Sequence, residues 1–255
     1  EIEILKEMGV EFRCGVEVGK DVTISGLREE GFQGFYLAIG AQGGRKVYVP
    51  GEDARGVVSG IQFIKEVNLG SETKLYGKTV VVGGGNVAVD VARTALRVGS
   101  GNVEMYCLES PEEMPAASDE VEEAEKEGIT VHHSWGPKEI LVKDGKAAGI
   151  VFKKCTAVFD ENHRFAPRYD EEDTITVECE HVLLSIGQSI EWGALLDGTR
   201  VELNKNGTVK ADPLTYQTGE PDIFAGGDVY SGPKFAIDAI AAGKEAAISL
   251  HRYVQ

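Results

Sequence analysis

The feature that most constrains this chain is residues 78–93, where an apolar β-branched run enters a glycine turn and a helical pattern leaves it. Gly83 permits the tight turn, Gly85 lets the backbone approach a diphosphate, and Ala88 keeps the helix close to the strand. The first free N–H groups of the helix then face the anion, at the positive end of the helix dipole. The stretch predicts a dinucleotide-binding unit with contacts from Gly83, Gly84, Gly85, Asn86, Val87 and Ala88.

A second apolar run, residues 102–108, follows the helix and ends in Glu109. An acidic residue about 20 residues past the glycines is placed to accept hydrogen bonds from the adenosine ribose hydroxyls. Ser110 is the next expected contact. The alternative is a glycine-rich turn that binds nothing. We favour the dinucleotide site because strand, turn, helix and acid stand in the order that it requires.

Length and charge narrow the class of protein. The 255 residues are enough for one or two domains with a full core, and 42% of them are apolar, which is ordinary for a globular chain. The formal charge of −16 repels phosphate backbones, which argues against nucleic acid as a partner. No apolar run in the sequence approaches the ~20 residues of a membrane helix, so no membrane association is expected.

The cysteines stand far apart, and none forms a Cys-x-x-Cys pair, so neither a dithiol of that spacing nor a cysteine-pair metal site is indicated. Isolated cysteines are most often small buried hydrophobes and fit a reducing compartment, so we expect structural cysteines and a cytoplasmic protein. His132 and His133 have no ligand partners at metal spacing, and no metal site is expected. The four cysteines are Cys14, Cys107, Cys155 and Cys179.

Periodicity and turn residues divide the rest of the chain into short elements. The chain opens at Glu1 without Met or a signal peptide, so we expect a fragment. Ser118 is expected to cap a helix that runs to residue 127, and Asp144 with Gly145 to turn a hairpin. The remaining expectations are a helix over 1–9, strands over 10–14, 16–24, 34–40, 129–134, 174–179 and 181–187, and a loop over 42–58.

Near the C-terminus, residues 222–228 form a short apolar strand that ends in Gly-Gly-Asp228. A carboxylate at the carboxyl end of a strand, just before a helix, sits where open α/β sheets bind ligands, although it can equally cap a turn. Pro233 is expected to open the helix. The apolar face of that helix carries Ile237, Ile240, Ala241 and Ile248.

Nearly the whole chain resembles the flavin-containing small (beta) subunit of glutamate synthase and, more broadly, the pyridine nucleotide–disulfide oxidoreductases. Six motifs in the right order are far more specific than any one of them. They are Tyr36-Leu-Ala-Ile-Gly-Ala41, Val49-Pro-Gly-Glu-Asp53, residues 83–90, Glu113-Met-Pro-Ala116, Leu184-Ser-Ile-Gly-Gln188, and residues 224–228 with 232–238.

The resemblance implies an α/β fold with two Rossmann-like dinucleotide-binding domains, the NAD(P) domain being inserted into a truncated FAD domain. Residues 1–70 and 191–255 then belong to the FAD domain, and residues 71–190 form the NAD(P) domain. The chain crosses between the two at Ala38-Ile39-Gly40 and at Gly187.

The resemblance also implies how a flavin is held and what the protein does. Gly227 and Asp228 meet the FAD ribitol, and the amides of Phe235, Ala236 and Ile237 point at the flavin pyrimidine edge. A hydride passes from NAD(P)H to FAD, and electrons leave through iron–sulfur centres or a partner subunit, such as a large catalytic subunit. The cofactors carry this chemistry, so no catalytic side chain and no metal ligand is expected.

Two departures from the family pattern matter. The only complete glycine fingerprint is the one at Gly83, so the unit that holds the FAD pyrophosphate is missing, and we expect the fragment to be inactive and poor in FAD. The relatives also place two arginines where this chain has Leu108 and Glu109, which favours NAD(H) over NADP(H). Alanine at the third fingerprint position, Ala88, is common among NADP-binding relatives and favours NADP(H). We give Glu109 more weight, because it is expected to contact the ribose 2′ position, where the two cofactors differ.

Two alternatives remain open. One is a disulfide reductase of the same architecture, which keeps its dithiol outside this stretch. The other is a non-catalytic dinucleotide-binding module, against which the flavin motifs argue.

Overall fold

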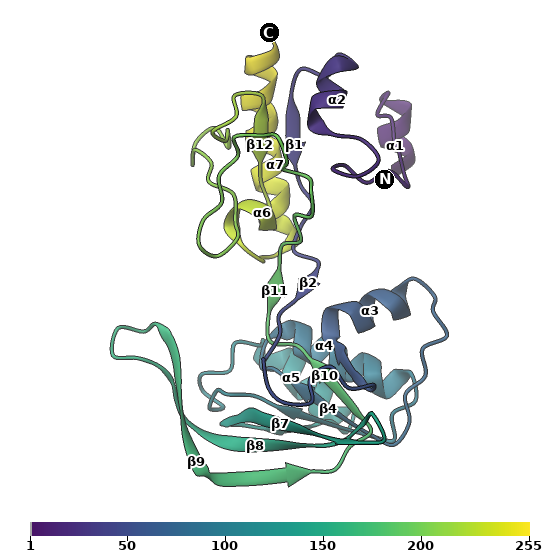
Figure 1. Cartoon of the computed structure of the whole chain (residues 1–255), viewed down its shortest axis with the longest axis vertical. Helices are drawn as coiled ribbons and strands as arrows, with labels where there is room; N and C mark the ends of the chain where they lie inside the picture. The colour runs from purple at the N-terminus through teal and green to yellow at the C-terminus, as the bar shows by residue number, and fades with distance from the viewer. Residues whose placement is uncertain (1) are drawn as a thin grey trace. The chain divides into compact units, whose positions relative to one another are not determined.

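The computed structural model describes residues 2–255, which form two compact units (Figure 1). The central unit is Gln42–Ser189, and the terminal unit joins the residues up to Ala41 to Ile190–Gln255. Residues 42–70 were expected in the first segment, but they pack in the central unit because β3 (Val57–Ser59) pairs with β10 (His181–Leu184). The boundary between the compact units therefore falls after residue 41 and not after residue 70.

The central unit is built on a parallel sheet of five strands in the order β3-β10-β4-β5-β6. Side chains of β4 (Lys78–Val82) alternate between its faces, and Val80, Val81 and Val82 are all buried. A strand covered on both faces reads as a continuous apolar run, which explains this part of the sequence. The two remaining strands are β5 (Asn102–Tyr106) and β6 (Thr130–His132).

Different layers cover the two faces of this sheet. Val81 and Leu183 pack on the helical side, where α4 (Asn86–Arg97) contributes a row of buried alanines. Val80 and Val82 pack on the opposite side against the three-stranded antiparallel sheet β7-β8-β9. The elements completing these layers are α3 (Gly60–Asn68), α5 (Ser118–Lys126), β7 (Trp135–Lys143), β8 (Lys146–Phe159) and β9 (Phe165–Val177) (Figure 1).

The strand order places a ligand site at one edge of the sheet. β5 and β6 follow β4 on one side, whereas β10 lies on its other side, so the order reverses between β4 and β10. Ligands of open α/β sheets bind outside the carboxyl ends of the strands at such a reversal. The glycine turn begins directly after β4 and therefore lies at this point.

The terminal unit is smaller and holds a two-stranded parallel sheet. In it β1 (Phe35–Leu37) pairs with β12 (Ile223–Ala225), and a core cluster around Ile24, Leu37 and Ile223 lies beside them. Its helices are α1 (Ile2–Glu7), α2 (Ile24–Glu29), α6 (Asp228–Ser231) and α7 (Ala236–Val254). A short ladder of β2 (Gly43–Gly44) with β11 (Gln188–Ser189) belongs to the central unit.

Several local expectations were wrong. Residues 10–22 form only one isolated bridge, between Val18 and Val22, and α2 begins at Ile24, where the Thr23 hydroxyl accepts a hydrogen bond from the Gly26 N–H at 3.0 Å. Ser118 is the first residue of α5 and does not cap it. The helix expected from Pro233 begins three residues later, after the separate turn of α6.

The hairpin prediction is confirmed. Asp144 and Gly145 adopt φ angles of +52° and +72° between β7 and β8. Two successive residues with positive φ match the right-handed twist of the strands, and Asp-Gly is the pair that takes them most easily.

Candidate functional site

Gly83 starts the turn that follows β4. Its N–H donates to the carbonyl oxygen of Tyr106 at 2.9 Å, and its φ is +144°, a conformation that other residues avoid. A Cβ at this position collides with the backbone carbonyl of Ser185, which follows β10. The turn therefore needs glycine both for its conformation and for the close approach of the neighbouring strand end.

Gly85 is the N-cap of α4, and its surroundings are open. A Cβ built on Gly85 meets no described atom within 4 Å, and its φ of −92° is ordinary. The first helical bonds come from the N–H groups of Ala88 and Val89 to the Gly85 carbonyl. The N–H groups of Asn86 and Val87 thus have no partner within the helix, as at every helix start, and are available to an anion beside Gly85.

Glu109 lies over the same turn. Its carboxylate oxygen is 2.7 Å from where a Cβ of Gly84 would stand, so the glycine leaves room for the acid. Burial raises the pKa of Glu109, and the neighbouring Glu113 raises it further. Hydrogen bonds from the backbone at Glu109 and Leu108, and to a lesser degree the charge of His133, partly oppose the shift. The structure therefore brings together the glycines and the acid that the sequence analysis selected from two separate segments.

Residues 110–117 also pack against the turn, which the sequence analysis missed. The Ala117 N–H donates to the Asn86 side-chain oxygen at 2.8 Å, and the Ala116 N–H donates to the Gly84 carbonyl at 3.1 Å. The Glu113 N–H donates to the Ser110 carbonyl oxygen at 3.2 Å. The motif Glu113-Met-Pro-Ala116 was the available signal, but the sequence analysis used it only for the family resemblance.

Gly187 follows β10 with a φ of +114° and lies beside Arg45. The Arg45 backbone N–H donates to the Gly187 carbonyl at 3.2 Å, and its guanidinium donates to the carbonyl of Gln188 at 3.1 Å. The sequence analysis did not select Arg45, since nothing in its spacing links residue 45 to residue 187.

The residues expected at the flavin lie in the terminal unit. Gly227 has a φ of +67°. The Asp228 carboxylate accepts a hydrogen bond from the backbone N–H of Lys234 at 3.2 Å. Phe235 is the N-cap of α7 and 71% exposed, and the amides of Ala236 and Ile237 start the helix in exposed positions. Such a helix start can receive the electron-rich edge of a ring. Ala38, Ile39 and Gly40 follow β1 in the same unit.

The cysteines are unpaired thiols, and all but Cys14 are buried. Burial raises the pKa of Cys107 and of Cys179 to about 12 and also raises that of Cys155. Thiols of this kind are inert at neutral pH because the thiolate is the reactive form. Within residues 2–255, no group of His, Cys, Asp and Glu side chains is arranged to hold a metal ion.

Among residues 2–255, no helix has the length and apolar character needed to cross a membrane.

A parallel sheet whose strand order reverses at a glycine turn, with a free helix N-terminus and an acid at the next strand end, defines a dinucleotide-binding α/β protein. Residues 8–243 match the family model described as pyridine nucleotide-disulphide oxidoreductase, and the chain belongs to this family. The resemblance and the α/β class expected from the sequence are confirmed.

Two curated relatives illustrate the similarity. The chain is 36% identical over 262 residues to the NADP(+)-dependent formate dehydrogenase subunit beta of Moorella thermoacetica, an alignment that covers 100% of this chain and 36% of the relative. It is 31% identical over 264 residues to the glutamate synthase [NADPH] small chain of Halomonas elongata, covering 98% of this chain and 56% of the relative. The chain thus spans between about a third and just over half of these proteins.

Solved structures show the same fold. FprA of Mycobacterium tuberculosis in complex with NADPH superimposes with a TM-score of 0.77 at 19% identity, over 94% of this chain and 67% of FprA. Thioredoxin reductase of T. acidophilum gives a TM-score of 0.64 at 22% identity, over 86% of this chain and 65% of that protein.

Proposed function

We propose that this chain is part of an oxidoreductase that moves a hydride from NAD(P)H to FAD. The observation that carries the proposal is the open space at Gly85. We infer that the N–H groups of Asn86 and Val87 bind the diphosphate there and that Glu109 accepts hydrogen bonds from the ribose hydroxyls. The hydride chemistry is supplied by the nicotinamide and the flavin. The residues of the chain bind and orient them, and no side chain is assigned as acid, base or nucleophile.

A substitution at Gly85 tests the dinucleotide site. Gly85→Ala has room for its methyl group in the protein alone, but alanine is a poorer N-cap than glycine, so the melting temperature is expected to fall slightly. The methyl group stands where the diphosphate must approach, and the Kd for NADH and NADPH is expected to rise about tenfold or more. Gly26→Ala, in the terminal unit and without a positive φ, is the matched control. Unchanged affinity in Gly85→Ala would contradict the proposed site.

The cofactor preference is proposed to be NAD(H). The carboxylate of Glu109 repels a 2′-phosphate, and the charge of Glu113 adds to this. Two charges about 4 Å apart interact by about 4 kcal/mol at an effective dielectric constant of about 20, and half of that exceeds a tenfold preference. The relatives described above are named for NADP(+) and NADPH, so this preference would set the chain apart from them.

Titration with both cofactors tests the preference. NADH is expected to bind about tenfold more tightly than NADPH, and Glu109→Arg is expected to reverse the order. Glu112→Arg makes the same charge change on an exposed side chain nearby and serves as the control. Equal or tighter binding of NADPH by the unmodified chain would refute the preference.

The terminal unit holds only part of a flavin site. Asp228 and the start of α7 supply contacts to the ribitol and the ring, but the sequence has no second glycine fingerprint for the FAD pyrophosphate. We therefore expect the 255-residue chain to retain little FAD and to have no steady oxidoreductase activity. Visible flavin absorbance near one FAD per chain after gel filtration would contradict this expectation.

The electrons are proposed to continue to iron–sulfur centres or to a partner subunit, as in glutamate synthase small-subunit-like proteins, in the cytoplasm. The names "subunit beta" and "small chain" of the relatives support a second subunit. The disulfide reductase alternative finds no support in the buried thiols, whose raised pKa values make them unreactive. A non-catalytic module would bind NADH without reducing an artificial acceptor in the full-length protein.

A further inference from the structure

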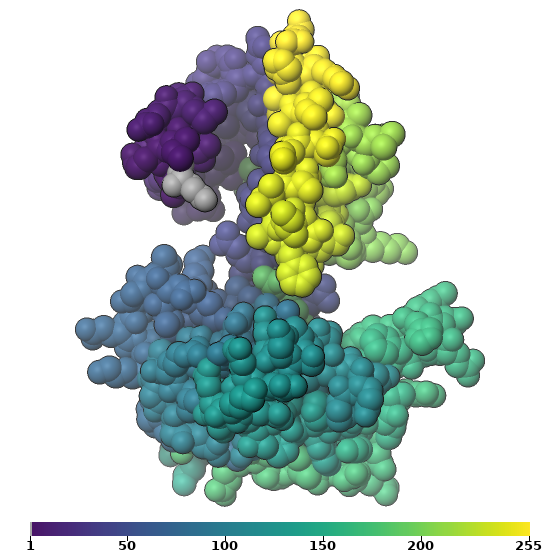
Figure 2. All heavy atoms as spheres, turned by 180° about the vertical axis from the view of Figure 1, so that it is seen from behind, coloured from purple at the N-terminus to yellow at the C-terminus, as the bar shows by residue number. Residues whose placement is uncertain are grey.

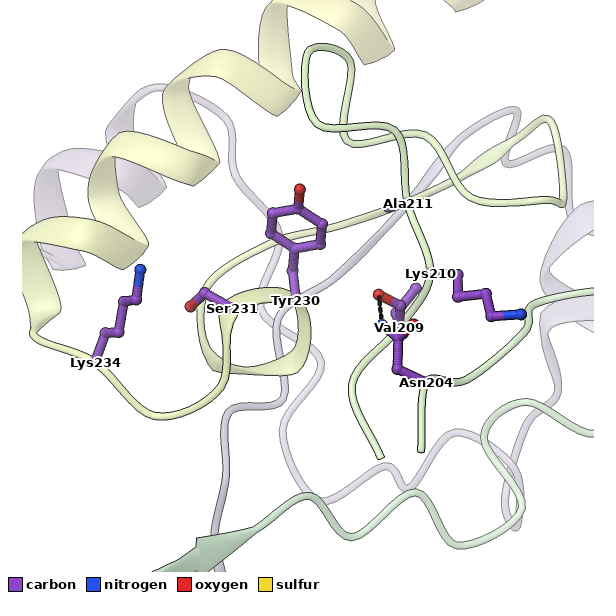
Figure 3. A pocket seen from close by; sticks show the side chains of 7 residues that line it. All are labelled: Asn204, Val209, Lys210, Ala211, Tyr230, Ser231 and Lys234. Atoms are coloured by element: carbon purple, nitrogen blue, oxygen red, sulfur yellow. Dashed lines mark hydrogen bonds between the residues drawn. The ribbon is translucent and has the colours of Figure 1, made fainter. Parts of the chain in front are cut away.

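The terminal unit contains a pocket of about 500 Å³ that the proposed hydride transfer does not use (Figure 3). This volume lies within the range of small-molecule sites. None of the residues expected at the dinucleotide or at the flavin lines it. The lining residues are Asn204, Val209, Lys210, Ala211, Tyr230, Ser231 and Lys234.

One wall is the loop that carries Asn204 and Val209. The Asn204 amide donates to the Thr208 hydroxyl at 3.0 Å and to the Val209 carbonyl at 3.4 Å. The Val209 N–H in turn donates to the carbonyl of Val229 at 2.8 Å, and both valines are fully buried. This loop is therefore fixed against Val229, the residue before Tyr230, without any ligand.

The opposite wall is the turn of α6, which carries Tyr230 and Ser231. The Ser231 hydroxyl donates to the backbone carbonyls of Gly227 and Gly232, so its O–H is not available to a ligand. The rings of Tyr230 and Tyr216 form an edge-to-face pair with centroids 5.2 Å apart. No hydrogen bond of the Tyr230 hydroxyl occurs among the described residues, which leaves this O–H free to donate.

The charges of the lining are all positive, although the chain has 42 acidic and only 26 basic residues. Lys234 forms no ion pair within residues 2–255. Lys210 pairs with Glu202 at 2.8 Å, but both side chains are more than half exposed, and exposed pairs of this kind are weak. Figure 3 shows Lys234 on one side of Tyr230 and Asn204 with Lys210 on the other.

We propose that this pocket binds a small organic anion, a phosphate ester or a carboxylate, through the Lys234 ammonium and the Tyr230 hydroxyl. Both groups are free to donate, and a hydrogen bond from a charged donor to an anion is among the stronger ones in proteins. The Tyr230 ring and Ala211 provide apolar surface for the uncharged part of the ligand. The Lys210 ammonium pairs with Glu202 and points away from Tyr230 in Figure 3, so Lys234 supplies the positive charge.

Calorimetric titration of the chain with AMP, citrate and inorganic phosphate at about 0.1 M salt tests the proposal. At least one of the two organic anions is expected to bind with a Kd of about 1 mM or lower. Lys234→Met is expected to raise this Kd about tenfold, and Tyr230→Phe about threefold. Lys244→Met removes the same charge from an exposed position on α7 outside the pocket, and it is expected to change the Kd less than about twofold.

The outcomes separate the possible ligands. Binding of AMP alone identifies a phosphate ester, and binding of citrate alone identifies a carboxylate. The absence of binding by both organic anions up to about 10 mM would overturn the proposal, as would binding of inorganic phosphate alone. An equal loss in Lys234→Met and Lys244→Met would also overturn it, because the effect would then be one of net charge. AMP is also a fragment of NAD(H) and can bind at the dinucleotide turn, so AMP binding supports this pocket only where Lys234→Met weakens it and Gly85→Ala does not.

Discussion

The central unit buries the apolar side chains of its helices, whereas the terminal unit leaves many of its own exposed. In α4 the alanines and valines of the apolar face have no accessible surface or almost none. In α7 the apolar face expected from the sequence is on the surface, with Ile237 69% and Ile240 58% exposed. Figure 2 shows α7, in yellow, running along the surface of its unit. A helical pattern thus predicts which face is apolar, but it does not tell what covers that face.

The largest difference between the units is expected at their glycine turns. Gly83→Ala places a Cβ against the Ser185 carbonyl at a φ of +144°, so the central unit is expected to fail to fold or to lose about 4 kcal/mol or more. Gly227→Ala, in the terminal unit at a φ of +67°, meets only Ala239 and is expected to lose about 1–2 kcal/mol. Denaturant unfolding measures both. A central unit that tolerates Gly83→Ala would contradict the close packing of the turn.

A second test compares equivalent truncations of apolar side chains. Leu183→Ala removes a side chain that is 1% exposed, and it is expected to lower the free energy of unfolding of the central unit by about 2–5 kcal/mol. Ile240→Ala is expected to change that of the terminal unit by about 0.5 kcal/mol or less, because the side chain lies on the surface. A large loss from Ile240→Ala would show that this face of α7 is covered in solution.

The reactivity of the cysteine thiols is also expected to differ between the two units. Cys14 of the terminal unit is exposed, whereas burial raises the pKa values of the three central-unit thiols, those of Cys107 and Cys179 to about 12. At pH 8 one thiol per native chain is expected to react rapidly with a disulfide reagent, and all four are expected to react in denaturant. The Cys14→Ser variant is the control and should show no fast reaction. Rapid modification of Cys107 would indicate a thiol role that the proposed function lacks.

The smallest expected effect is the pH dependence due to Glu109. Its folded pKa is raised, so the folded state holds this proton more tightly than the unfolded state does. Its ionisation therefore costs stability above the folded pKa, and this cost disappears below the unfolded pKa of about 4.3. Glu109→Gln is expected to raise the melting temperature at pH 7 and to match the unmodified chain near pH 4. A lower melting temperature at pH 7 would mean that the carboxylate is stabilised by a partner.

Local rules predicted the parts of the site that depend on neighbouring residues. The turn at Gly83, the start of α4 at Asn86 and the hairpin at Asp144 follow from backbone preferences that act over a few residues. The contacts of Arg45 with Gly187 and of Ala117 with Asn86 could not be predicted, because they join segments far apart in the sequence. The strands expected over residues 10–24 failed for a related reason, since a strand forms only where a partner strand lies beside it.

The sequence by itself determined the α/β class, the dinucleotide turn and the acid that follows it, because each of these depends on residue type and short spacing. Tertiary structure alone decided that the carboxylate of Glu109 lies over Gly84, that residues 42–70 pack in the central unit, and that Lys234 and Tyr230 share a pocket. The physical reason is that burial, pKa and pocket shape depend on which distant segments come together, and the spacing of residues along one segment does not record this.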